Sequence, residues 1–119
     1  MKDSEVTVKC VVWDLDNTIW DGTLLEDSDV SLNKEAVDVI KELDNRGILQ
    51  SISSKNEFNS AFEKLKEFDL HEFFLYPQIN WAAKSSSLKN IAENLNINID
   101  TFAFIDDQAF EREEVCFAH

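Results

Sequence analysis

The chain has 119 residues, a hydrophobic fraction of 44% and a formal net charge of −13 at pH 7. This length fits a single domain over residues 1–119, and the acidic balance argues against a nucleic-acid partner, because phosphates require a basic face. No stretch approaches the ~20 apolar residues of a membrane helix and the N-terminus lacks the apolar run of a signal peptide, so we expect a cytoplasmic protein without membrane contact.

The first predicted element is a strand over residues 6–13, which is rich in β-branched residues and almost continuously apolar. Such a run is typical of a strand buried on both faces. Asn33 then offers a helix N-cap, and apolar residues follow at helical spacing. Arg46 and Gly47 provide a basic last turn and a left-handed stop, so a helix is expected between Asn33 and Arg46.

Three further strands are predicted over residues 48–53, 73–76 and 102–105. Pro77 ends the middle one, because proline cannot donate to a sheet ladder. A helix after Asn56 carries its apolar side chains on one stripe, and so does a helix that reaches Leu95. The last predicted helix begins near Phe110 and reaches the end of the chain.

This alternation of strands and helices predicts a Rossmann-like α/β fold, with a parallel sheet flanked by helices. Ligands of such sheets bind beyond the carboxyl ends of the strands. The stretch from residue 20 to residue 32 is short and acidic, too short for a cap domain. We therefore expect an open site, which favours a large or protein-borne substrate.

Polar residues follow the end of each predicted strand. Asp14 and Asp16 follow the first, Ser54 the second, Lys84 the third and Asp106-Asp107 the fourth. Carboxylates gathered in this way repel one another unless a hard cation such as Mg²⁺ binds their oxygens. A nucleophilic aspartate can attack phosphorus, while a metal and a lysine offset the charge of the transferring group. The pattern thus predicts phosphoryl transfer.

Each of these pieces also has an ordinary structural interpretation. An Asp-x-Asp after a strand is often a turn, a lysine ahead of a helix is often a surface charge, and paired serines or aspartates often cap a helix. The functional interpretation rests on finding all four in order, each after a separate strand.

The ordered set resembles the four signature motifs of the haloacid dehalogenase (HAD) superfamily. The residues that carry the resemblance are Val11-Val12-Trp13-Asp14-Leu15-Asp16-Asn17-Thr18, Ser54, Lys84 and Asp106-Asp107. The resemblance implies that Asp14 is the nucleophile and Asp16 the general acid/base. It also implies that Ser54 holds the phosphoryl oxygens and that Lys84 neutralises the nucleophile and the phosphate.

The same resemblance implies a Mg²⁺ site. Asp14, the backbone carbonyl of Asp16, and Asp107 would bind the ion directly. Asp106 would support these ligands without binding the ion itself. The motif of the last strand departs from the usual pattern of the closer family described next, because Gln108-Ala109 stand where that family has Asn-Pro.

Longer motifs resemble the FkbH-like family of polyketide assembly lines. They are Asp16-Asn17-Thr18-Ile19-Trp20-Asp21-Gly22, Ser54-Lys55-Asn56, Ile79-Asn80-Trp81 and Phe104-Ile105-Asp106-Asp107 with Glu111-Arg112-Glu113. This resemblance implies removal of phosphate from a phosphorylated glycerate and loading of the glyceryl group onto an acyl carrier protein. It makes Thr18, Trp20, Lys55 and Asn56 candidates for substrate binding. Core packing is the ordinary interpretation of Trp20 and Trp81, and the alternative is that one of them lines the open substrate mouth.

Carrier proteins of these pathways are acidic, so docking to this acidic chain would need a local basic patch. Lys55, Lys84, Lys89 and Arg112 could supply one near the mouth of the site. The chain stops at His119, before a fifth strand could form, so a C-terminally truncated domain is expected.

Two alternatives to the transferase remain open. One is a general cap-less Mg²⁺-dependent phosphatase of small phosphate esters, and the other is a non-catalytic HAD-like interaction domain. The two cysteines, Cys10 and Cys116, match no metal-binding spacing and are expected to be buried thiols. Cys10 lies four residues before Asp14 within the first strand, roughly 13 Å away at the rise of a strand, and Cys116 lies nine residues past Asp107, on the order of 10 Å from the metal if that stretch is helical. Neither is therefore expected to carry an acyl intermediate.

Overall fold

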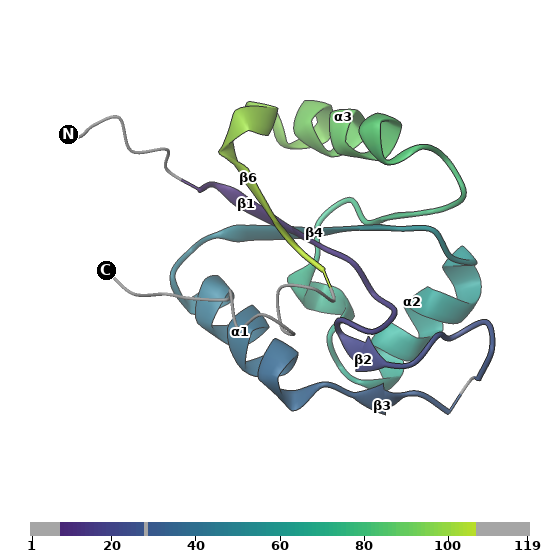
Figure 1. Ribbon diagram of the computed structural model, residues 1–119. Helices are drawn as coiled ribbons and strands as arrows, with labels where there is room; N and C mark the ends of the chain where they lie inside the picture. The colour runs from purple at the N-terminus through teal and green to yellow at the C-terminus, as the bar shows by residue number, and fades with distance from the viewer. Residues whose placement is uncertain (1–7, 28, 107–119) are drawn as a thin grey trace.

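The computed structural model describes residues 8–27 and 29–106 and shows a three-layer α/β/α arrangement (Figure 1). The strands of its parallel sheet are β1 (Cys10–Trp13), β4 (Leu49–Ser54), β5 (Gln78–Ile79) and β6 (Phe102–Ile105). Their order across the sheet is β5-β4-β1-β6. The helices are α1 (Lys34–Asn45), α2 (Phe58–Glu67) and α3 (Lys84–Leu95), with short 3₁₀ helices at His71–Phe73 and Ile99–Thr101.

The central strand β1 is buried on both faces, as its continuous apolar sequence predicts. Val11 and Trp13 face a core shared with α1 and α2, whereas Cys10 and Val12 face a smaller core under α3. Figure 1 shows α3 on one side of the sheet and α1 and α2 on the other. The predicted Rossmann-like α/β fold, with a parallel sheet flanked by helices, is confirmed, and the described residues contain no cap domain.

The ends of α1 follow the predicted capping chemistry. The side chain of Asn33 accepts hydrogen bonds from the backbone N–H groups of Glu35 and Ala36, which have no partner within the helix. Gly47 adopts a left-handed backbone with φ of 77° just after the helix, a conformation that glycine adopts without steric cost. The strand β4 can therefore begin only two residues later, at Leu49.

A small hairpin that the sequence did not reveal lies between β1 and α1. Its strands, β2 (Trp20–Asp21) and β3 (Ser31–Leu32), pair antiparallel with Trp20 opposite Leu32. Strands of two residues are too short to show an alternation of apolar and polar residues, so the sequence pattern did not predict this hairpin. The hairpin is the only folded insertion in the described part of residues 14–33.

The third strand was predicted in the wrong place. Residues 71–73 form a 3₁₀ helix, and the paired residues of β5 are Gln78 and Ile79. Leu75 does donate a backbone hydrogen bond to Gln50 at 2.8 Å, but Tyr76 then takes a left-handed conformation with φ of 49°. That turn interrupts the apolar run 73–76, and regular pairing with β4 resumes only beyond Pro77.

Several predictions concern residues outside the described ranges. They are the final helix near Phe110, the carboxylate of Asp107, the patch residue Arg112, the thiol of Cys116 and the beginning of the first strand. No helix in residues 8–27 and 29–106 is long and apolar enough to cross a membrane.

Candidate functional site

The candidate site lies where the strand order reverses, at the carboxyl ends of β1, β4 and β6. The chain runs from β1 to β4 and β5 on one side and returns to β6 on the other side of β1. Asp14 follows β1 and donates its backbone N–H to Ile105 of β6 at 3.0 Å. Asp14 and Asp106 therefore leave adjacent parallel strands at the same edge, which is where ligands of open α/β sheets bind.

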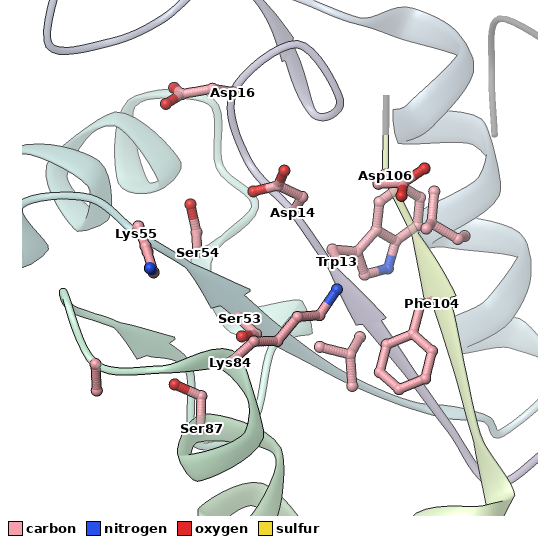
Figure 2. A pocket seen from close by; sticks show the side chains of 13 residues that line it. Trp13, Asp14, Asp16, Ser53, Ser54, Lys55, Lys84, Ser87, Phe104 and Asp106 are labelled. Atoms are coloured by element: carbon pink, nitrogen blue, oxygen red, sulfur yellow. The ribbon is translucent and has the colours of Figure 1, made fainter. Parts of the chain in front are cut away.

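A pocket of about 400 Å³ opens at this edge. Its lining residues include Asp14, Asp16, Ser53, Ser54, Lys55, Lys84, Ser87, Phe104 and Asp106. Figure 2 shows Asp14, Ser54 and Lys84 around the same space, with Asp106 and Lys55 at opposite sides of it. Five of the residues predicted from the strand ends, Asp14, Asp16, Ser54, Lys84 and Asp106, thus meet in one pocket.

Asp14 is half-buried, and its environment disfavours the charged form. Burial raises the pKa of its carboxyl above the ordinary value, and the neighbouring charge of Asp16 adds to this rise. Hydrogen bonds from the backbone of Leu15, at 2.8 Å, and from the Ser54 hydroxyl act in the opposite direction, as does the charge of Lys84. The carboxylate at this position therefore gains from any cation that enters the pocket.

Lys84 and the start of α3 provide the positive side of the pocket. Lys84 is the first residue of α3, and its Nζ lies 5.2 Å from the centre of the Phe104 ring. No side chain caps this helix N-terminus, so its first N–H groups and the helix dipole favour an anion nearby. Ser87, one turn later, is buried and also lines the pocket.

Asp16 is held more firmly than Asp14. Its carboxylate accepts hydrogen bonds from the indole of Trp20, the backbone N–H of Leu24 and the side-chain amide of Asn56. These donors come from the hairpin and from the loop after β4, so the carboxylate joins two segments that border the pocket.

We compared the chain with protein-family models, with curated proteins and with solved structures. No family model matches the chain. The human protein named magnesium-dependent phosphatase 1 is 27% identical over an alignment that covers 84% of this chain and 68% of that protein. A crystal structure of the N-terminal part of a Bacteroides fragilis protein, containing a phosphatase domain complexed with Mg, superposes with a TM-score of 0.78 at 31% identity.

That superposition covers 92% of this chain but 33% of the Bacteroides structure, so this chain spans one third of that structure's length. A structure from Legionella pneumophila described as a HAD-superfamily hydrolase of subfamily III A has a TM-score of 0.64 at 20% identity. The superposition covers 82% of this chain and 53% of the Legionella chain. The chain has the fold of the HAD-superfamily phosphatases.

Within this HAD fold, three of the predicted substrate-binding residues occupy different places from those expected. Thr18, Trp20 and Asn56 have no exposed surface, and none of them lines the pocket. Their positions do not favour the expected direct contact with a substrate, because each side chain is fully buried beside the pocket rather than in its lining. Lys55, by contrast, is exposed and lines the pocket.

The two tryptophans left open by the sequence have opposite environments. Trp20 belongs to the main hydrophobic core, whereas Trp81 is 60% exposed. Trp81 follows Asn80 and precedes Ala82, and Ala82 lines the pocket. Core packing is therefore the correct interpretation of Trp20, and Trp81 lies on the open side, near the mouth.

The oxygen ligands of the expected Mg²⁺ site are only partly within the described residues. Asp14, Asp16 and Asp106 all line the pocket, but the described part of the chain contains no group of three or more acidic, histidine or cysteine side chains placed to hold one ion. Asp107, the predicted ligand from the last motif, lies outside those ranges. The donor set is nevertheless of the hard oxygen type that suits Mg²⁺.

Cys10 lies inside the sheet, fully buried against α3. Burial raises the pKa of its thiol to about 11, so the nucleophilic thiolate is scarce at neutral pH. This is the environment expected of a structural cysteine rather than of an acyl carrier.

Sequence reasoning missed Ser87 and the role of the hairpin. A signal for Ser87 existed, because it follows Lys84 by three residues and so shares its helix face. The contact of Leu24 with Asp16 is made by a backbone N–H, and no side-chain pattern could have revealed it.

Proposed function

We propose that the chain is a Mg²⁺-dependent phosphatase of the HAD type that works through a phosphorylated Asp14. The observation that carries this proposal is the convergence of Asp14, Ser54 and Lys84 on one pocket at the switch point, with Asp16 beside them. The name of the human relative and the phosphatase domain in the Bacteroides structure support the same class of reaction.

In the first step, a carboxylate oxygen of Asp14 forms a bond to phosphorus as the bond between phosphorus and the leaving oxygen breaks. Asp16 gives its proton to that leaving oxygen. The Ser54 hydroxyl and the ammonium of Lys84 bind the phosphoryl oxygens, and the uncapped start of α3 favours their negative charge. In the second step, Asp16 takes a proton from the water that attacks phosphorus, which releases phosphate and restores Asp14.

The residues present fit Mg²⁺. The raised pKa of Asp14 marks a carboxylate whose charge is poorly compensated by the protein alone. We propose that Asp14, the backbone carbonyl of Asp16, and Asp107 hold the ion, with Asp106 in support. When bound, Mg²⁺ offsets the negative charge that gathers on the phosphoryl group.

The pocket also suggests the kind of substrate. It is wide for a lone phosphate, and Lys55 stands exposed at its rim with no ion pair to any described acidic residue. A second anionic group on the substrate would form an ion pair with the ammonium of Lys55. We propose a phosphorylated glycerate or a related phosphorylated acid, in keeping with the FkbH-like motifs.

Glyceryl transfer to an acyl carrier protein is the finer form of this proposal. The open site without a cap leaves room for a protein-borne acceptor, and the exposed Lys55 and Lys84 line the pocket that an acidic carrier would approach. Lys89 is exposed on α3 but does not line this pocket. Cys10 is too deeply buried to hold an acyl group, so the described part of the chain supplies removal of phosphate, and any thioester step uses a thiol elsewhere.

The test is phosphate release with Mg²⁺ from a phosphorylated glycerate and from 4-nitrophenyl phosphate, followed by mass analysis of an added carrier protein. Both esters should release phosphate without the carrier. Lys55→Met should raise the KM for the phosphorylated acid about tenfold and leave 4-nitrophenyl phosphate unaffected, because a paired charge is worth roughly one such factor. The control is Lys89→Met, on the exposed surface of α3.

Complete inactivity of the wild type toward both esters would support the non-catalytic alternative. Activity toward both with no selective effect of Lys55→Met would support a general phosphatase of small esters. A carrier that gains a glyceryl group only in the presence of the active chain would establish the transferase.

A further inference from the structure

The carboxylate of Asp16 is fixed by three donors. Its Oδ1 accepts from the indole N–H of Trp20 at 2.9 Å and from the backbone N–H of Leu24 at 3.0 Å. Its Oδ2 accepts from the side-chain amide of Asn56 at 3.1 Å. We refer to Trp20, the Leu24 backbone and Asn56 together as the Asp16 clamp.

The two side-chain donors of the clamp are themselves immobilised. Trp20 and Asn56 are both 0% exposed. Trp20 pairs with Leu32 through its backbone and packs at 6.3 Å from the ring of Phe68. If the Asp16 side chain rotated away, the indole N–H and the amide would stay behind without their acceptor, which is costly for a buried polar group. The clamp therefore favours a single orientation of the carboxylate.

The three hydrogen bonds are distributed unevenly over the two carboxylate oxygens. Oδ1 receives two of them and Oδ2 receives one. Since a carboxylate oxygen can accept two hydrogen bonds, Oδ2 retains capacity for one more. Asp16 lines the pocket, so Oδ2 is the oxygen at which a proton can be exchanged with a bound substrate or water.

We propose that Trp20 and Asn56 are positioning residues, which hold Asp16 so that its Oδ2 exchanges protons with the leaving oxygen and with the attacking water. This inference rests on the proposed function, in which Asp16 is the general acid and base. Trp20 and Asn56 act only through Asp16, because neither side chain lines the pocket.

The variant Trp20→Phe separates this role from packing, since phenylalanine fills much of the same core space but donates no hydrogen bond. The readout is the ratio of kcat/KM values for phenyl phosphate and 4-nitrophenyl phosphate, because kcat/KM reports the phosphorylation of Asp14 and not the later hydrolysis that both esters share. A poor leaving group needs a proton as it departs, whereas nitrophenolate leaves without one. Trp20→Phe should lower kcat/KM about tenfold for phenyl phosphate and less than about threefold for 4-nitrophenyl phosphate, since general-acid assistance is worth about 10²-fold or more and the clamp is only part of it.

Asn56→Asp provides an independent variant. It keeps the oxygen that accepts from the backbone N–H of Glu57, but it replaces the amide donor with a second acceptor beside Oδ2. The same selective loss for phenyl phosphate is expected. The control is Ile40→Val on α1, a fully buried core change away from Asp16, which should lower the melting temperature and leave the ratio of the two kcat/KM values unchanged.

The outcomes separate this inference from the function on which it rests. A wild-type chain that released no phosphate from either ester would overturn both. An active wild type whose Trp20→Phe variant lost the same factor on both esters, as a general core defect would cause, would overturn the clamp alone. A changed ratio in Trp20→Phe and Asn56→Asp, together with an unchanged ratio in Ile40→Val, would establish Trp20 and Asn56 as positioning residues.

Discussion

The segment after β1 and the segment after β5 both border the pocket, but their packing is opposite. In residues 14–24, Leu15, Thr18, Ile19 and Trp20 have no exposed surface, and the chain is tied down by backbone and side-chain hydrogen bonds. In residues 80–83, Asn80 donates to Ser54 and Ala82 donates to Asn80, while Ala83 accepts only from Ser86 and Ser87 at the start of α3. Trp81 is 60% exposed. The first segment carries Asp14 and Asp16, the groups proposed to react, and the second leaves the pocket accessible.

This difference separates two requirements of a phosphatase without a cap. The reacting carboxylates must be fixed before the substrate arrives, because small misplacements lower the rate steeply. The mouth must admit substrates of different size, and an exposed, sparsely bonded segment does so at little cost in folding stability. Changes in residues 14–24 should therefore alter chemistry or stability, and changes in residues 80–83 should alter mainly the binding of substrate.

The largest effect is expected for Asp14→Asn, which should lower phosphate release by a factor of about 10⁴ or more, because an amide neither attacks phosphorus nor balances Mg²⁺. Without Mg²⁺, the variant should melt above the wild type at neutral pH. Burial raises the pKa of Asp14 above its unfolded value of 3.8, so the stabilisation associated with its protonated form is lost as pH rises through the folded pKa.

The measurement is a series of thermal melts with chelator across the acid-to-neutral range. The advantage of Asp14→Asn should shrink as the pH falls toward 3.8. Adding Mg²⁺ should raise the melting temperature of the wild type but not that of the variant. The exposed Asp21→Asn on β2 is the control and should change none of these values, and a variant that melted well below the wild type would contradict the account of Asp14.

The two tryptophans sharpen the comparison between the segments directly. Trp20→Ala should cost about 3–5 kcal/mol of unfolding free energy, because it empties a fully buried site and removes one of the three donors to Asp16. Trp81→Ala should change stability by less than about 0.5 kcal/mol, as is usual at exposed positions. Chemical denaturation of both variants checks this, and equal losses would show that the segments do not differ as described.

A smaller effect is expected for Lys84→Met, about 10²-fold in kcat/KM, through loss of the charge that binds the phosphoryl oxygens. Lys89→Met, on the same helix and also exposed, is the matched control and should retain wild-type kinetics. Steady-state kinetics with 4-nitrophenyl phosphate decide between them. Similar losses in both variants would point to a general effect of charge on this acidic chain rather than to a site-specific contact.

The strand ends were the most predictable part of this molecule. A continuous apolar run in the sequence predicts a buried parallel strand such as β1. The strand β6 was predicted with its observed bounds, 102–105. The helix N-cap at Asn33 follows from local chemistry alone. Topology then brings Asp14, Ser54, Lys84 and Asp106 to one edge of the sheet, whatever the details of the loops.

The missed features depend on contacts between distant residues. The bond between Asp16 and Asn56 spans 40 residues and requires the observed register of β1 against β4. The prediction of a strand over 73–76 was wrong because these apolar residues lie in a turn that packs on the core, and they do not form a ladder with β4. Sequence patterns report burial and periodicity, and they do not distinguish a buried side chain that supports the site from one that touches the substrate.

The most direct test of the central claim is to trap the phosphorylated enzyme. The wild-type chain would be mixed with Mg²⁺ and 4-nitrophenyl phosphate, quenched rapidly in acid, digested and mapped by mass spectrometry. The account predicts phosphate on the peptide that contains Asp14, and none in Asp14→Asn treated in the same way. Phosphate release by a wild type that carries no phosphate on Asp14, or turnover by the Asp14→Asn variant at the wild-type rate, would contradict it.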